Sequence, residues 1–407
     1  MKEHNPTLSS VHLSVRIPMG SCHDPEGMLG LSHYLEHLVF KSTRRFPELN
    51  GVMKYAESLG ASLNAHTSND HTLFYIIGPT AKLEELASIL SEVVLHSTFT
   101  EEHVQTERDI ILQEYATTLD DQWHTKLILP SNQTRYNNTK VYNNIIGDTE
   151  TINAIDYATL RSVYDKYYVN GDYFINASGN IGDESTFCGI IPKYFNRDFD
   201  GTPVNKHPNV ETPPAIYGNH YSGVGLSEDN AKVWINFEDL TIDNIKDFHI
   251  LQITNEYLGA GVNSRLWSVI REEHALAYQI GSGFGYPSFT PSIGSLYVYS
   301  ETSPENVDKL VDLVLSEFNI LCTEGISQDR FDAIVARVLG SQAVQSDTRS
   351  YHPEEMEMQF KCFGRFYTDA QMLEELQSLT LEDVNNMCRR FDPTKYTKAI
   401  LYPSKGE

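Results

Sequence analysis

The chain has 407 residues, more than one hydrophobic core usually spans, and 40% of them are hydrophobic, so two globular domains are expected. Its 31 Lys and Arg residues against 55 Asp and Glu residues give a formal net charge of -24 at pH 7. This charge argues against nucleic acid and anionic membranes as partners and favours basic partners. An ordinary acidic surface is the alternative explanation of the same charge.

Apolar residues at strand or helix spacing define the elements of the first half. The predicted strands cover residues 7–18, 61–67, 72–78 and 173–179, and the predicted helices cover residues 51–59, 82–94, 101–118 and 157–168. Residues 198–220 then hold four prolines among polar residues without periodicity. We therefore expect a linker at residues 201–220 between domains at 1–200 and 221–407.

The second half repeats the order of the first. Its predicted strands cover residues 232–237, 294–298 and 398–402, and its predicted helices cover residues 243–258, 264–272, 305–321, 329–345 and 372–390. The glycines at 281, 283 and 285 lack the spacing of a nucleotide-binding loop and are interpreted as bends near a strand. The predicted fold class is α+β, with two similar domains that each pack a mostly antiparallel sheet against several helices.

A short apolar helix in the first half carries the sequence His33-Tyr34-Leu35-Glu36-His37. At helical spacing, the two imidazoles project from one face about a turn apart, with Glu36 beside them. The flanking residues are apolar, so the helix is expected to be buried, where unpaired polar groups are costly. The order H-x-x-E-H is that of an inverzincin zinc site, and from these five residues alone histidines that hydrogen-bond within a core explain the pattern equally well.

The helix predicted over residues 101–118 carries Glu107 and Glu114, seven residues apart, close to its apolar stripe. Carboxylates on a buried stripe need partners, so this helix offers a candidate third metal ligand. The alternative is two acids at the edge of a solvated helix.

These residues resemble the pitrilysin-type metallopeptidases, the superfamily of insulin-degrading enzyme and the mitochondrial processing peptidase. In that family H-x-x-E-H is followed after about 76 residues by a glutamate ligand, with another glutamate seven positions earlier. Here 76 residues separate His37 from Glu114, and Glu107 stands at the earlier place. The resemblance extends over almost the whole chain, at the length of the two-domain processing-peptidase branch. Two departures from the family are expected. Relatives usually carry an additional strand and turn before the segment equivalent to residues 11–18, and many have a different side chain at His66.

The resemblance implies one zinc ion per chain, held by His33, His37 and Glu114, with a fourth position left for water. Glu36 is then the general base that takes the proton of this water and later returns it to the leaving amine. Glu107 lies roughly 10 Å along the helix from Glu114, too far to bind the same ion, so we expect it to orient a ligand histidine.

Substrate-binding residues follow from the same resemblance. Asn64 and Ala65 lie on the strand with which the family holds the substrate backbone, in the manner of an added β-strand. Arg271 and Tyr278 match the arginine and tyrosine that reach the active site from a distant domain, where they would hold the substrate carbonyl and its developing negative charge. From the residues alone, Asn64 is better explained as a strand-end residue that bonds its own turn, and Arg271 and Tyr278 as packing residues, so their functional roles rest on the resemblance.

The predicted function is a zinc-dependent endopeptidase for short or unfolded peptides, which the acidic charge would bias toward basic ones. In relatives, two chains or four linked domains enclose a chamber, so we expect a homodimer in which Arg271 and Tyr278 approach the zinc of the other subunit. A heterodimer with a related chain is an alternative for the assembly. A non-catalytic structural or assembly subunit, and a metal-binding protein without hydrolytic activity, are alternatives for the function.

The cysteines and the N-terminus bear on the compartment. Five widely spaced cysteines without a C-x-x-C pair are typical of buried thiols in a reducing compartment. Residues 1–6 lack the apolar core of a signal peptide, and no apolar run is long enough to span a bilayer. We expect a cytoplasmic protein, although a processed form from another compartment would show the same sequence.

Overall fold

The computed structural model describes residues 2–137, 142–182, 184–195, 213–225, 229–285, 293–348, 359, 362–363 and 365–404. Within them the chain forms two compact units. The first contains residues 2–118 and the described residues between 142 and 195, and the second contains residues 119–137 and those between 213 and 404. Most of the expected linker, residues 201–212, lies outside the described residues.

The first unit is built on a five-stranded sheet in the order β1-β5-β2-β4-β3. Its strands are β1 (Lys2–His4), β2 (Ser10–Ile17), β3 (Ser62–Thr67), β4 (Thr72–Pro79) and β5 (Phe174–Gly179). Strand β1 pairs with β5 in parallel, and the other three pairings are antiparallel. No strand was expected before residue 7, so β1 is an addition at the edge of the sheet.

The second unit has a five-stranded sheet in the order β6-β10-β7-β9-β8. Its strands are β6 (Tyr221–Val224), β7 (Ala231–Thr241), β8 (Ala277–Gly285), β9 (Ile293–Thr302) and β10 (Thr397–Tyr402). Numbered within its own unit, each sheet has the order 1-5-2-4-3, with only the outer 1-5 pair parallel. The predicted α+β class with two similar, mostly antiparallel domains is therefore confirmed.

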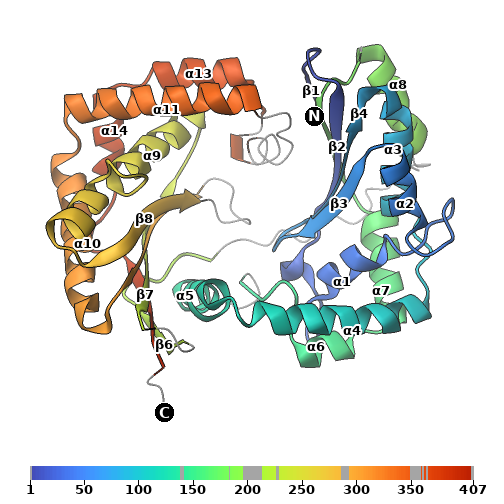
Figure 1. The fold of residues 1–407 in the computed structure, drawn as a ribbon, viewed down its shortest axis with the longest axis horizontal. Coiled ribbons are helices and arrows are strands. Elements are labelled where there is room, and N and C mark those ends of the chain that lie inside the picture. Colours follow the sequence, from blue (N-terminus) through green and yellow to red (C-terminus); the bar gives the residue numbers. More distant parts are fainter. Residues whose placement is uncertain are drawn as a thin grey trace. The chain divides into compact units, whose positions relative to one another are not determined.

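Helices cover one face of the first sheet (Figure 1). Val11, Leu13, Val15 and Ile17 of β2 belong to the hydrophobic core of this unit, because the alternation of the strand places every second residue on the same face. The helices and helical turns are η1 (Ser21–His23), α1 (Leu31–Leu38), α2 (Gly51–Ser58), η2 (Thr80–Lys82), α3 (Leu83–Leu95), α4 (Glu101–Thr118), α6 (Thr149–Ala154), α7 (Tyr157–Tyr164), η4 (Asp165–Val169) and α8 (Glu184–Phe195).

The helices of the second unit form a separate core with its sheet. They are η3 (His124–Ile128), α5 (Leu129–Tyr136), α9 (Ile245–Leu258), η5 (Trp267–Glu273), η6 (Pro304–Asn306), α10 (Val307–Glu324), α11 (Gln328–Thr348), α13 (Asp369–Gln377) and α14 (Leu381–Cys388). The single helix predicted over residues 372–390 is two helices, α13 and α14. The break lies at Thr380, whose Oγ1 accepts a hydrogen bond from the Asp383 amide and so begins α14 with an N-cap.

The segment of residues 119–137, which the sequence analysis assigned to the first domain, packs in the second unit. Leu127 contacts Ala399 and Leu401 of β10. Arg135, which is 1% exposed, donates hydrogen bonds to the Phe237 carbonyl at 2.7 Å and to Asp239 Oδ1 at 2.5 Å. A buried guanidinium needs such partners, and they lie on β7, so they fix this segment to the second sheet.

The glycines interpreted as bends lie inside strand β8, which is a correction to the sequence analysis. Gly281 and Gly283 pair with Tyr299 and Tyr297 of the neighbouring strand β9. A Cβ atom at either glycine would come within 2.5 Å of a tyrosine hydroxyl oxygen. The glycines therefore make room for two tyrosine side chains that lie across the strand, and they do not mark a turn.

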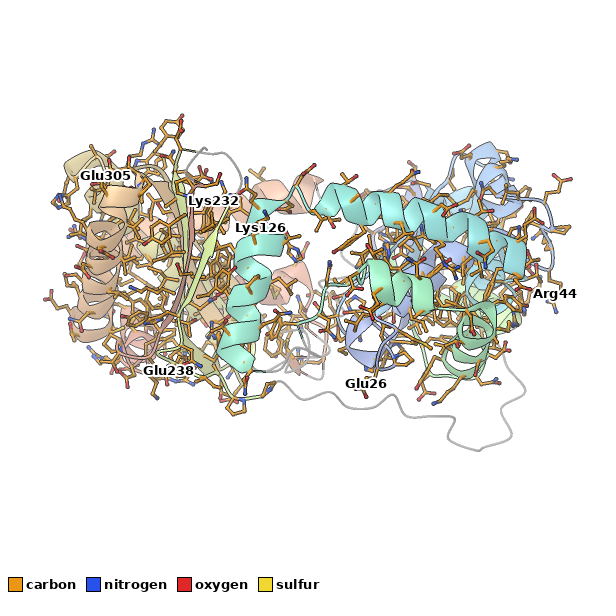
Figure 2. All side chains as sticks on the ribbon, turned by 90° about the horizontal axis from the view of Figure 1, so that it is seen from below. Glu26, Arg44, Lys126, Lys232, Glu238 and Glu305 are labelled. Atoms are coloured by element: carbon orange, nitrogen blue, oxygen red, sulfur yellow. The ribbon has the colours of Figure 1, made fainter. Side chains whose placement is uncertain are left out.

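Side chains fill the space between sheet and helices within each unit, whereas Glu26 and Glu305 are exposed to solvent (Figure 2). The exposed acidic residues account for part of the net charge of -24. Cys188, Cys322 and Cys388 are free thiols. Within the described residues, each helix is either too short or too polar to cross a lipid bilayer.

A buried histidine on β2 makes the stability of the fold depend on pH. Burial lowers the pKa of His12 from 6.5 to about 4. The unfolded chain therefore protonates His12 at a higher pH than the folded chain does. The stability that comes from keeping His12 neutral is fully present above about pH 6.5 and is lost as the pH falls toward 4. Between pH 7.5 and pH 5, we expect wild type to lose about 2 kcal/mol more unfolding free energy than His12→Gln in urea titrations. Equal losses in both proteins would contradict this prediction.

Candidate metal centre

Helix α1 presents two histidines on one face, as its sequence predicts. The ring centroids of His33 and His37 lie 4.6 Å apart. The opposite side of the helix is apolar, with Leu31, Leu35 and Leu38 fully buried in the core of the first unit. The apolar residues therefore fix which way the imidazoles point.

A buried aspartate holds the start of this helix. Asp24 Oδ2 accepts a hydrogen bond from the Gly30 amide at 2.8 Å, and Oδ1 accepts from the Ser32 amide at 3.0 Å and from its hydroxyl at 2.6 Å. Gly30 has a φ of 92°, and a Cβ there would lie 2.3 Å from the Ile146 carbonyl oxygen, so only glycine fits. Together these contacts fix where the metal-motif helix begins.

Helix α4 packs beside α1 and brings two glutamates to the histidines. The Tyr34 hydroxyl donates a hydrogen bond to the Val104 carbonyl, which fixes the two helices against each other. His37 Nδ1 lies 2.9 Å from Glu107 Oε1. Two turns further along α4, Glu114 Oε1 lies 3.6 Å from His33 Nε2, and Glu114 Oε2 lies 3.5 Å from His37 Nε2.

The three side chains predicted as ligands form a set that fits a tetrahedral metal ion. One ligand atom from each of His33, His37 and Glu114 lies within 4.8 Å of the others. Zinc binds nitrogen and oxygen at about 2.0–2.1 Å, so ligand atoms on a tetrahedron around it are roughly 3.4 Å apart. The 3.6 Å separation joins His33 Nε2 to Glu114 Oε1 and the 3.5 Å separation joins His37 Nε2 to Glu114 Oε2, so each imidazole nitrogen lies near this distance from one oxygen of the same carboxylate. Two imidazoles and a carboxylate are also ligands that zinc prefers.

The two glutamates differ in exposure, which the sequence did not indicate. The side chain of Glu107 is 3% exposed and that of Glu114 is 44% exposed. Glu114 thus does not lie on a buried stripe but faces the open side of the site. When ionised, Glu36, Glu107 and Glu114 carry three negative charges and Lys41 carries one positive charge, so these side chains sum to -2. A bound dication would balance this charge.

The surroundings set the protonation of the two histidines in different ways. Burial, with a smaller contribution from His37, lowers the pKa of His33 to about 3, so its imidazole is neutral and able to bind a metal at neutral pH. Burial also disfavours a charged His37, but the hydrogen bond with Glu107 and the nearby carboxylates outweigh it and raise the pKa of His37. Burial would raise the pKa of Glu107, yet its hydrogen bonds with His37 and Lys41 outweigh it and lower that pKa.

Glu36 lies beside the two histidines and is held from the neighbouring strand. Its Oε2 accepts a hydrogen bond from the Thr67 hydroxyl of β3 at 2.6 Å. Burial raises the pKa of Glu36, and the Thr67 hydrogen bond opposes this rise. A carboxylate whose pKa lies above its ordinary value is a better proton acceptor, which suits a general base.

Strand β3, which carries Asn64 and Ala65, is the edge strand of its sheet among the described strands. Asn64 Oδ1 accepts a hydrogen bond from the Ala65 amide at 2.9 Å. Next to this edge and to Glu36 lies a cavity of about 450 Å³. Its lining residues are Glu36, His37, Phe40, Lys41, Asn50, Met53, Lys54, Glu57, Asn64 and Glu107. The predicted substrate strand and the predicted base therefore border one cavity.

Arg271 and Tyr278 meet each other in the second unit. The Arg271 guanidinium lies 4.1 Å from the ring centroid of Trp267 and 4.6 Å from that of Tyr278. Tyr278 falls at a register shift between Ala277 and Gln279 of β8, and it is 84% exposed. A bulge of this kind turns a side chain out of the regular alternation of the strand, so the tyrosine is presented to solvent.

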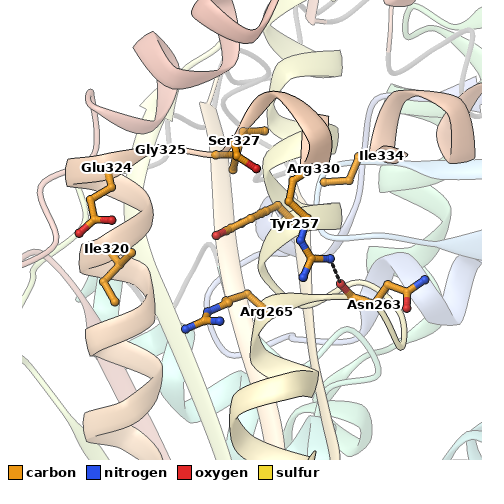
Figure 3. A pocket seen from close by; sticks show the side chains of 10 residues that line it. Tyr257, Asn263, Arg265, Ile320, Glu324, Gly325, Ser327, Arg330 and Ile334 are labelled. Carbon is orange, nitrogen blue, oxygen red and sulfur yellow. Dashed lines mark hydrogen bonds between the residues drawn. The ribbon is translucent and has the colours of Figure 1, made fainter. Parts of the chain in front are cut away.

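The second unit also contains a cavity of about 400 Å³ beside α10 and α11 (Figure 3). Arg330 donates a hydrogen bond to the Asn263 carbonyl at 3.2 Å, and Arg265 is paired with Glu317. The lining residues are Tyr257, Asn263, Arg265, Ile320, Glu324, Gly325, Ile326, Ser327, Arg330 and Ile334. This lining holds no histidine or cysteine and a single carboxylate, so it does not offer a metal-binding set.

Three side chains that hold the site were not predicted from the sequence: Asp24, Lys41 and Thr67. The signal for Lys41 was partial, because it follows His37 by four residues, a spacing that places side chains on one helix face, but α1 ends at Leu38. The signal for Asp24 was weaker, since a helix cap normally directly precedes the helix. Thr67 depends on the approach of β3 to α1, which no local pattern contains.

Comparison with known proteins identifies the family. The sequence model described as "Insulinase (Peptidase family M16)" matches residues 1–149, and the one described as "Peptidase M16 inactive domain" matches residues 154–338. The chain belongs to peptidase family M16. The pitrilysin-type resemblance is thereby confirmed, and the M16 domain called inactive is the half that lacks H-x-x-E-H.

Relatives of this M16 chain span nearly its full length. A Bacillus subtilis protein named "Uncharacterized zinc protease YmxG" is 25% identical over 99% of this chain and 95% of its own. A Rickettsia felis protein named "Uncharacterized zinc protease" is 23% identical over 98% and 94% of the two chains. The homologues are thus named zinc proteases.

Solved structures share the fold. A protease from Helicobacter pylori has a TM-score of 0.80 at 18% identity, over 97% of this chain and 95% of that chain. The periplasmic protease PqqL from Escherichia coli has a TM-score of 0.75 at 18% identity, over 98% of this chain but 45% of its own. At these identities the likeness establishes the M16 fold.

The ligand set can be tested by zinc content. We expect wild type to retain one zinc ion per chain after dialysis, measured by mass spectrometry of the metal, and Glu114→Gln to retain well below one because a neutral amide is a weaker ligand. Glu102→Gln, which changes an exposed glutamate of the same helix, is the matched control and keeps the wild-type content. An unchanged zinc content in Glu114→Gln would remove Glu114 from the ligand set.

Proposed function

We propose that the chain is a zinc-dependent endopeptidase that hydrolyses short or unfolded peptides. The observation that carries this proposal is the convergence of His33, His37 and Glu114 on one point, with Glu36 beside them. One zinc ion per chain would be held there. When bound, zinc supplies Lewis-acid activation of water and of the scissile carbonyl.

The side chains of the site divide the work of hydrolysis among them. Glu36 takes the proton of the attacking water and passes it to the leaving amine, and the Thr67 hydroxyl holds its carboxylate in place for both transfers. Glu107 accepts the Nδ1 proton of His37, which leaves Nε2 of this ring toward Glu114. His33 stays neutral because it is buried.

The substrate would bind as an added strand along β3. An edge strand presents unpaired amide and carbonyl groups, and β3 brings Asn64 and Ala65 close to the cavity that Glu36 borders. Extended, unpaired backbone is needed for such pairing, so short or unfolded peptides suit this edge better than folded proteins. The acidic net charge would favour Lys- and Arg-containing peptides.

We propose a homodimer in which Arg271 and Tyr278 complete the active site of the other subunit, and a heterodimer with a related chain is the alternative assembly. The exposure of Tyr278 and its contact with Arg271 support a role outside the core of the second unit. There the pair would hold the substrate carbonyl and stabilise its developing charge. The free thiols of Cys188, Cys322 and Cys388 support a cytoplasmic location.

A second candidate function is a non-catalytic assembly subunit of the same fold. The family description of the second half as inactive fits such a role for that half. The complete set of His33, Glu36, His37 and Glu114 in the first half favours the peptidase, because an assembly role needs none of these residues.

The role of Glu36 is tested by Glu36→Gln, which removes the base but keeps its size. We expect one zinc ion per chain to be retained and cleavage of a quenched basic peptide to fall by about 10²- to 10⁴-fold. Wild-type rates in Glu36→Gln would refute the mechanism.

The charge preference is tested with a second substrate. At low salt, wild type should cleave an acidic peptide of matched length more slowly than the basic peptide. Equal rates on both peptides would refute the charge preference.

The shared active site is tested by mixing two inactive variants, Glu36→Gln and Arg271→Ala. If each site combines Glu36 of one chain with Arg271 of the other, random mixing gives half heterodimers with one intact site, so about a quarter of wild-type activity returns. If both residues act within one chain, the mixture stays inactive. An active wild-type monomer in sedimentation measurements would also contradict the proposal.

A further inference from the structure

Lys41 lies one turn after His37, just beyond the end of α1, and it contacts the same glutamate as this histidine. Its Nζ is 2.5 Å from Glu107 Oε2, while Glu107 Oε1 is 2.9 Å from His37 Nδ1. Each oxygen of this carboxylate therefore has its own partner. The side chains of Glu107 and Lys41 are 3% and 18% exposed, so water competes little for either contact.

We propose that Lys41 is a positioning residue for the metal centre, which acts on His37 only through Glu107. The inference rests on the proposed zinc site, because His37 is one of its ligands. It adds a residue that follows neither from the H-x-x-E-H motif nor from the set of metal ligands. The chain of contacts runs from Lys41 to Glu107, then to His37, and ends at the metal position.

The ammonium group fixes the plane of the carboxylate. The terminal torsion of a glutamate side chain is broad, so a carboxylate with one partner can rotate. With Oε2 held by Lys41, Oε1 stays directed at His37 Nδ1 and accepts the proton there. This hydrogen bond selects the imidazole form whose Nε2 lone pair is free, and Nε2 is the atom that faces Glu114.

The same contact also keeps a charged carboxylate inside the protein. An unpaired buried carboxylate is costly, and His37 alone is neutral when it binds a metal. Lys41 supplies the opposite charge without occupying a ligand position. A lysine that served only this purpose would stabilise the fold but would leave metal affinity unchanged, and this difference separates the two roles.

The test measures the zinc dissociation constant by competition with a chelator in a double-mutant cycle. We expect Lys41→Met to weaken zinc binding about 10- to 100-fold, as does Glu107→Gln, which is the typical effect of losing a group that orients a ligand histidine. Because Lys41 acts only through Glu107, the double variant should bind zinc no more weakly than Glu107→Gln alone. Lys41→Arg keeps the charge and should recover most of the affinity.

Two further measurements exclude a loss of folding as the cause. Lys193→Met breaks an exposed lysine–glutamate pair with Glu84 in the same unit and should keep wild-type zinc affinity. The visible spectrum of the cobalt-substituted protein should shift in Lys41→Met but not in Lys193→Met, because only the first changes the surroundings of a ligand.

Wild-type zinc affinity in Lys41→Met, or additive losses in the double variant, would overturn the inference. So would a wild-type chain that binds no zinc. Peptide cleavage is not a readout of this cycle, so the two proposals can fail separately. A chain that shows the expected cycle but cleaves no peptide refutes the proposed peptidase and leaves the role of Lys41 standing.

Discussion

The contact between His37 and Glu107 is the constraint on which the site depends. Helix α1 is apolar on most sides, so its polar side chains must find partners inside the first unit. Glu107 hydrogen-bonds Nδ1 of His37 at 2.9 Å, and this leaves Nε2 of the same ring directed at Glu114. The hydrogen bond from the Tyr34 hydroxyl to the Val104 carbonyl holds α4 against α1, and Glu107 and Glu114 of α4 then lie beside the two histidines of α1.

The two units have the same sheet topology but carry different candidate functional residues. Both sheets have the order 1-5-2-4-3 with a parallel outer pair, an agreement in topology that indicates duplication of one unit although the halves share little sequence. The third strand of each sheet is an edge strand. In the first unit it is β3 with Asn64, and in the second it is β8 with Tyr278. The same position thus carries different chemistry in the two units.

The sequence predicts most of the site because its information is local. His33 and His37 follow from helical spacing within five residues, and the seven-residue interval between Glu107 and Glu114 places both on one side of a second helix. The spacing does not indicate how deeply each glutamate is buried. Glu107 is buried and Glu114 is exposed, although the seven-residue interval puts both on the same side of α4. The packing of residues 119–137 in the second unit was missed for a similar reason, as Arg135 finds its partners about a hundred residues away in the chain.

The residues that sequence patterns missed share one property: each contacts another residue of the site and is not itself one of the predicted ligands or the predicted base. Asp24 holds the start of α1, Thr67 holds Glu36, and Lys41 holds Glu107. A metal motif specifies which groups must converge, but it leaves open what keeps them there, because many combinations of donors and charges can do so. Two of these partners come from outside α1 and the third from just beyond its end, so they become visible only when strands and helices are packed together. The motif therefore identifies the chemistry, and the packing determines how rigidly the site is held.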